Sequence, residues 1–202
     1  MFFFLRGLII GFSIAAPVGP IGVLSIRRTL TQGWLIGLLT GLGAATADGI
    51  YGCIAGFGLT FIADVLIQQT FWFRLLGGVF LCCLGVKTIL SQPADREASI
   101  QSQGLVGAYL STVFLTLTNP MTILAFAAVF AGLGLASTAG NYLQATILVL
   151  GVFLGSALWW LLLSGGVSLL RTAFTPKRLQ WLNRISGLIL LVFGIIALHP
   201  GL

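Results

Sequence analysis

The residue with the clearest potential for chemistry is Asp48, which lies deep inside an apolar segment that runs from about Trp34 to Ile62. At a rise of about 1.5 Å per residue, Asp48 lies ~21 Å along a helix that begins at Trp34, near the middle of a hydrocarbon layer ~30 Å thick. A carboxylate at that depth is costly unless it faces protein or water, so intramembrane acids usually mark functional sites. The alternative is a protonated Asp48 that makes a structural hydrogen bond between helices.

Two apolar segments contain prolines that should interrupt a helix. The first segment carries Pro17, Gly19 and Pro20 within a few residues, and the fourth carries Asn119 and Pro120. Proline removes a backbone donor and glycine adds conformational freedom, so the helix should break at both places. Asn119 is suited to the N-cap and Pro120 to the first position of a new half-helix. In a membrane such breaks persist where protein or a watery cavity satisfies the freed groups.

Each break would expose backbone N–H groups at the positive end of a half-helix, which attracts an anion such as an amino acid's carboxylate. Asp48 supplies the opposite charge, suited to an α-amino group or a proton. Together they predict a site for a zwitterion near the middle of the membrane. The alternative is that the prolines only kink their helices.

The composition is that of an integral membrane protein with a single domain over residues 1–202. The chain is 58% hydrophobic and 7% charged, with a mean hydropathy of +1.10, so a soluble surface cannot be made from it. The net charge of +6 is spread over the ends of the apolar segments, which indicates contact with anionic lipids rather than nucleic acid. The three cysteines and His199 show no metal-binding spacing, so we expect neither a metal nor a cofactor.

Hydropathy predicts an all-α fold of six membrane spans, at about 2–26, 34–62, 71–92, 105–135, 142–170 and 184–199. Lys and Arg concentrate after the first, third and fifth spans. The positive-inside rule therefore places these connections in the cytoplasm, including a connecting loop at 93–104, and both termini outside.

The two halves resemble each other, at about 1–92 and 105–202. Shifts of 109, 108 and 100 positions superpose glycines and aromatic residues of spans three, two and one on those of spans six, five and four. The matched sets are Trp72, Gly78 and Gly85 on Trp181, Gly187 and Gly194; Gly43, Tyr51 and Gly58 on Gly151, Trp159 and Gly166; and Gly7, Gly19 and Pro20 on Gly107, Asn119 and Pro120. Because each half has an odd number of spans, the repeats must be inverted, an architecture typical of transporters.

These motifs, taken in order, resemble the lysine exporter (LysE/RhtB-type) family of amino-acid exporters. They are Pro-Val-Gly-Pro in the first span, the lone acid in the second, Asn-Pro in the fourth and Gly-Ser-Ala-Leu-Trp-Trp at 155–160. The resemblance implies a multi-pass protein of the bacterial inner membrane that exports amino acids or their derivatives by proton antiport. Carried over by position, the functional residues are Pro17, Gly19, Pro20, Asp48, Asn119 and Pro120, and we add Trp159 as a candidate cavity wall with Trp160 in helix packing. Ile21 and Met121 depart from the polar residues common in that family.

Four other functions can be compared with the sequence. A divalent-cation exporter would want several converging ligands, and a thiol-reductant conduit would want cysteines beside the prolines. An intramembrane hydrolase has candidate nucleophiles in Ser13, Ser25 and Ser156 but no base at membrane depth. A non-transport scaffold would not explain two broken helices. The shortage of acids besides Asp48 favours neutral amino acids as substrates, and assembly into a homo-oligomer is left open.

The charge asymmetry predicts the topology. In a background without native cysteines, a membrane-impermeant thiol reagent applied from outside should modify Thr138→Cys and leave Asp95→Cys unmodified. The opposite labelling pattern would overturn the assigned orientation.

Overall fold

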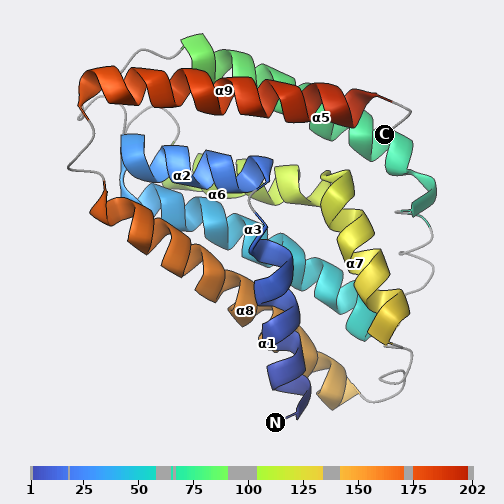
Figure 1. Cartoon of the computed structure of the whole chain (residues 1–202). Helices are drawn as coiled ribbons and strands as arrows, with labels where there is room; N and C mark the ends of the chain where they lie inside the picture. The colour runs from blue at the N-terminus through green and yellow to red at the C-terminus, as the bar shows by residue number, and fades with distance from the viewer. Residues whose placement is uncertain are drawn as a thin grey trace.

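The chain forms a bundle of α-helices. The computed structural model describes residues 2–17, 19–57, 65, 67–90, 104–133, 142–170 and 175–199, and all regular secondary structure in these ranges is helical. The elements are α1 (Phe2–Ala15), α2 (Pro20–Gln32), α3 (Trp34–Gly56), α5 (Thr70–Leu90), α6 (Gly104–Leu117), α7 (Pro120–Leu133), α8 (Tyr142–Leu169) and α9 (Pro176–Leu198). In Figure 1, α5 and α9 lie together along one side of the bundle, and α1, α3 and α8 form the opposite part.

Two helix pairs are sharply bent at the expected breaks. The axes of α1 and α2 differ by 80° across the Pro17–Pro20 segment, and those of α6 and α7 by 58° at Asn119. Asn119 caps the start of α7 as predicted, because its side-chain Oδ1 accepts a hydrogen bond from the Met121 N–H at 3.2 Å. The predicted breaks in the first and fourth apolar segments are therefore present.

Several helices are long and apolar enough to cross a membrane. By length and composition, three of the described helices qualify, namely α5, α8 and the Gln180–Leu198 part of α9, and the number rises to five if each bent pair is one span. Helix α3 lies inside the bundle, where Ala44, Ala45 and Ala47 are almost fully buried against other helices. These spans agree with a multi-pass membrane protein, while six spans in inverted repeats stay a prediction.

Close helix packing depends on glycine. Helix α1 packs along α8, and a Cβ on Gly11 or Gly155 would overlap the backbone carbonyl of Val152 or Leu8 on the facing helix. Helices α5 and α9 pack in the same way and run antiparallel (Figure 1). Helix α3 fills the centre, between α8 on one side and α6 and α2 on the other.

The helix bounds differ from the hydropathy boundaries at two places. The first segment continues to Gln32, so Arg27 and Arg28 lie within α2 rather than in a loop, and Gly33 alone joins α2 to α3 with a φ of 111°. Helix α9 begins at Pro176 because Thr175 caps it and accepts a hydrogen bond from the Arg178 N–H. The basic residues in the first turns of α9 lower the mean hydropathy there, so hydropathy placed the start of the helix too far along the chain. The connecting loop expected at 93–104 lies outside the described residues except for its last one, where α6 begins.

Glycine packing on α8 gives a matched test. Gly155→Ala should lower the free energy of unfolding by about 1–3 kcal/mol, because the added methyl group meets backbone that cannot move aside. Gly165→Ala on the same helix meets no atom within 4 Å and should be neutral or slightly stabilising. Thermal unfolding in detergent measures both, and equal effects would contradict the packing described for α1 and α8.

Candidate functional site

The two helix breaks border one partly open cavity of about 360 Å³. This volume is in the range of pockets that take small molecules. The residues predicted for the site that line this cavity are Pro17, Gly19, Pro20, Asp48, Asn119 and Pro120. Segments that are a hundred residues apart in the sequence therefore contribute to one site.

Asp48 is the acid in this cavity. Its side chain is 3% exposed, and its Oδ2 accepts a hydrogen bond of 2.7 Å from the Ser156 hydroxyl on α8. Ser156 is fully buried, so the bond joins the centres of α3 and α8 inside the protein. A hydrogen bond from a neutral donor leaves the second carboxylate oxygen available for a proton or a cationic ligand.

The break between α6 and α7 is satisfied by neighbouring side chains. The Tyr51 hydroxyl on α3 donates a 2.8 Å hydrogen bond to the carbonyl of Leu117, the last residue of α6. The Tyr51 ring stacks on Phe126 of α7 at a centroid separation of 5.2 Å. Tyr51 therefore contacts both halves of the broken segment and stabilises the gap between them.

The break between α1 and α2 is open toward the cavity. Gly19 is the N-cap residue of α2 and offers no side-chain acceptor, and a Cβ at this position would meet no atom within 4 Å. The N–H groups of Ile21 and Gly22 follow Pro20 in the first turn of α2, where no preceding helical carbonyl is available to them. This helix start can accept an anionic or carbonyl group from a ligand.

The structure exchanges the roles expected for the two tryptophans. Trp160 is 4% exposed and lines the cavity, whereas the Trp159 ring packs edge-to-face on Phe12 of α1 at 5.4 Å. Adjacent helical residues point about 100° apart, so one of the pair had to face away. The choice of Trp159 as a cavity wall is corrected to Trp160. Gly41 on α3 leaves the space that the Trp160 side chain occupies.

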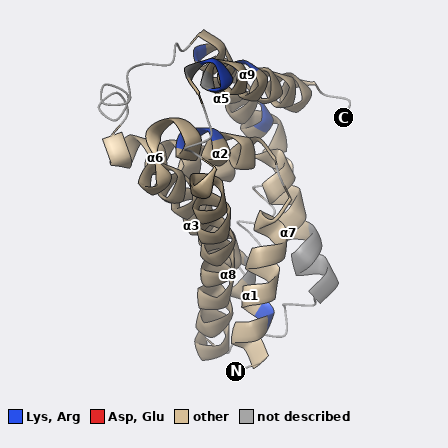
Figure 2. Cartoon of the chain, turned by 60° about the vertical axis from the view of Figure 1, so that its left-hand side comes forward, with Lys and Arg blue, Asp and Glu red and all other residues tan. Residues whose placement is uncertain are grey.

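Arg28 is a buried cation that sequence reasoning assigned to a loop. Its side chain is 1% exposed on α2, and Nη1 donates to the Ala108 carbonyl of α6 and to Thr40 Oγ1 of α3, both at 3.0 Å. Further bonds reach Thr112 Oγ1 at 3.2 Å and, from Nη2, Ser111 Oγ at 3.0 Å. Arg28 thus holds α2 against α6 and α3, and fixes the orientation of the two broken segments beside the cavity. Lys and Arg also occur on α5 and α9 and near the start of α1 (Figure 2).

The part of the chain that the structure describes contains no cluster of side chains that could coordinate a metal ion. No three His, Cys, Asp or Glu side chains come together there. The cavity lining combines the Asp48 carboxylate and the Arg74 guanidinium with helix starts and the rings of Trp160 and Phe193.

Comparison with known proteins finds a matching family model and several relatives. A family model described as LysE type translocator matches residues 12–201. The "Putative amino acid efflux protein YcgF" of Bacillus subtilis is 30% identical over 98% of this chain and 96% of its own length. The "Uncharacterized membrane protein YahN" of Escherichia coli is 25% identical over 87% of this chain and 80% of its own length. The "Chemotactic transduction protein ChpE" of Pseudomonas aeruginosa is 28% identical, with 77% of each chain covered. No solved structure matches the chain significantly.

The Arg28 contacts predict a difference between two basic residues. Arg28→Lys should lower the free energy of unfolding by about 2 kcal/mol, because one ammonium group cannot replace a guanidinium fork that reaches both α3 and α6. Arg184→Lys, at an exposed position on α9, should change it by less than about 0.5 kcal/mol. A thermal shift in detergent compares the two, and a stable Arg28→Lys protein would show that the buried network is dispensable.

Proposed function

Because the chain belongs to the LysE type translocator family and is an efflux transporter of the membrane, we propose that it exports amino acids or their derivatives, neutral ones above all, across the bacterial inner membrane in exchange for protons. The observation that carries the proposal is a buried carboxylate, Asp48, in a cavity bounded by two broken helices. Discontinuous helices that surround a midplane site are the usual means by which secondary transporters bind ions and substrates.

Proton coupling follows from the cost of a charge in the apolar interior. Asp48 can be neutralised by a proton or by the ammonium group of a substrate, and one carboxylate does not bind both at once. The binding site passes through the low-dielectric interior at least cost when the charge of Asp48 is neutralised. The conformational change therefore takes place with either a proton or a substrate bound. Mutual exclusion at Asp48 would then make export and proton entry obligatory partners.

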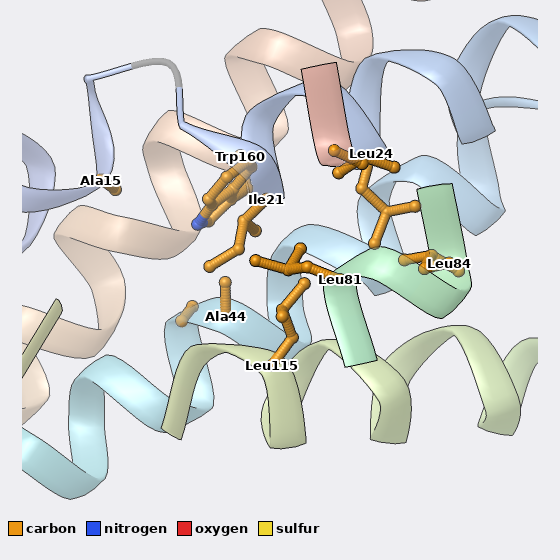
Figure 3. Packing of buried hydrophobic residues seen from close by; sticks show 10 residues of the cluster. Ala15, Ile21, Leu24, Ala44, Leu81, Leu84, Leu115 and Trp160 are labelled. Atoms are coloured by element: carbon orange, nitrogen blue, oxygen red, sulfur yellow. The ribbon is translucent and has the colours of Figure 1, made fainter. Parts of the chain in front are cut away.

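A layer of apolar side chains closes the cavity on one side. Ile21 and Leu81 line the cavity and belong to a buried cluster with Leu24 and Leu115, all less than 9% exposed (Figure 3). On the other side the cavity wall includes Met121, which is 70% exposed. This difference supports alternating access, in which the apolar layer parts to admit substrate from the opposite side.

Contacts within the bundle also support inverted repeats. A Cβ on Gly78 would lie 3.0 Å from the Gly194 carbonyl oxygen, and a Cβ on Gly85 would lie 2.8 Å from that of Gly187. A shift of 109 positions takes Gly78 to Gly187 and Gly85 to Gly194, so it converts each of these two contacts into the other. A two-fold axis between α5 and α9 requires this exchange. Asp48 and its hydrogen-bond partner are 108 positions apart, which is the shift that relates α3 to α8. The substrate site would then lie on the axis that relates the repeats.

Removal of the charge from Asp48 tests the proposed exchange. In proteoliposomes with a proton gradient, Asp48→Asn should lose uphill transport of radiolabelled amino acids and the pH dependence of transport, because the side chain is fixed in a neutral state of the same size. The wild-type protein, assayed against a panel of amino acids, identifies the substrate class. Folding is checked by gel filtration and thermal unfolding.

Each outcome has a defined meaning. Wild-type protein that moves no amino acid would contradict the substrate class. Asp48→Asn protein that pumps uphill with the wild-type pH dependence would show that Asp48 is structural and that protons cross elsewhere.

A further inference from the structure

Helices α5 and α9 form a pair whose members are held at backbone distance. Glycines of each helix face the other helix, and a Cβ on Gly187 would lie 2.7 Å from the carbonyl oxygen of Gly85. Figure 1 shows the pair along one side of the bundle, with α1, α3 and α8 in the opposite part. Backbone contact leaves little room for one helix to tilt against the other, so we expect α5 and α9 to keep their arrangement when other contacts change.

Helix α9 meets α2 in two successive layers beside the cavity. The first layer is apolar and includes Leu24 of α2 and Leu190 of α9, both fully buried. The second is polar, because the Arg27 Nε–H donates a hydrogen bond of 2.9 Å to Oδ1 of Asn183, whose side chain is buried. The cavity-lining residues of α2 precede Leu24 and those of α9 follow Leu190, so the hydrogen bond lies beyond the apolar layer as seen from the cavity.

The pair also touches the break between α6 and α7, on the other side of the apolar layer. A Cβ on Gly77 of α5 would lie 2.7 Å from the Thr118 carbonyl oxygen in that break. Gly77 lies about one turn before Leu81, a cavity-lining residue, and two turns before Leu84 of the apolar cluster. The pair is therefore in backbone contact with the rest of the bundle beside the cavity and in side-chain contact with it beyond the apolar layer. Such an arrangement can pivot at the first contact and separate at the second.

We propose that α5 and α9 move as one rigid pair that pivots at the Gly77–Thr118 contact, and that the Arg27–Asn183 hydrogen bond is a latch that opens each time the cavity reaches the side where α9 begins. This inference rests on the proposed function, because export requires the cavity to open on both sides in turn. A bond between a guanidinium and a neutral amide suits a latch. Its opening leaves no unpaired buried anion, so it costs less than the separation of a buried ion pair.

A reversible cross-link across the latch tests the proposal. In a background without native cysteines, Arg27→Cys and Asn183→Cys are joined by a short bis-methanethiosulfonate reagent, because the length of the arginine side chain keeps the two backbones too far apart for a direct disulfide. The cross-linked protein should lose amino-acid transport in proteoliposomes, and reduction of the cross-link should restore it. Recovery on reduction shows that the loss comes from restraint of the latch and not from unfolding.

A cross-link within the pair is the matched control. Cys82 is kept as the native cysteine and combined with Leu191→Cys, since Cys82 faces Gly194 and Leu191 faces Gly85 across the same interface. The same reagent should leave transport unchanged, because both helices move together. Transport that continues with the latch cross-linked, or that stops equally with the control cross-link, would overturn the inference. Failure of the proposed function appears instead as no amino-acid transport by the wild-type protein.

Access to the cavity tests the latch without a need for transport. Ala44→Cys places a thiol on the cavity wall, and an impermeant thiol reagent applied from the side where α9 begins reaches it when the two closed layers part. Asn183→Ala removes the acceptor of the latch and should speed this labelling about fivefold or more, the effect of one lost hydrogen bond on the closed state. Arg184→Gln, at the exposed neighbouring position, should leave the labelling rate unchanged. Equal rates in the two variants, both shown to be folded by thermal unfolding, would overturn the latch.

Discussion

Polar groups that are removed from water must find partners within the protein, and this constraint governs the arrangement around the cavity. The hydroxyl of Ser156 holds Asp48, the Tyr51 hydroxyl satisfies the carbonyl at the end of α6, and the Arg28 guanidinium binds acceptors on two other helices. Each of these bonds joins different helices. The polar contacts that make the breaks tolerable in an apolar environment therefore also fix the positions of the helices that form the site.

Two kinds of contact join the helices of the bundle: some are hard to break, and others can separate and form again. Glycine-mediated backbone contact joins α1 to α8 and α5 to α9, and the buried guanidinium joins α2 to α6. The layer beside the cavity consists of leucine and isoleucine side chains, such as Ile21 against Leu81. Such contacts are non-directional and can re-form in a second arrangement, whereas the buried polar bonds need the same geometry each time. Movement between the paired helices therefore costs least at the apolar layer.

Local chemistry made the two breaks predictable from sequence, since an Asn-Pro pair at a helix start and a Pro-Val-Gly-Pro segment have few other conformations. The position of Asp48 inside a membrane span was also predictable, because the apolar segment around it is too long for the side chain to reach a loop. The phase of α8 was not predictable: Trp159 and Trp160 are equally apolar, and the choice between them depends on where α1 and α3 lie. Arg28 was missed because a basic residue near the end of an apolar segment looks the same in the sequence whether it faces headgroups or other helices.

The proposed transport cycle depends on the exchange of a proton for a substrate at one carboxylate, Asp48. Its most direct test is the proton movement itself, recorded with a pH-sensitive dye inside proteoliposomes while an amino-acid gradient is imposed in the absence of a pH gradient. The account predicts that protons move opposite to the amino acid with the wild-type protein and that this movement is absent with Asp48→Asn. Amino-acid flux through the wild-type protein without proton movement, or proton movement that persists in the variant, would contradict it.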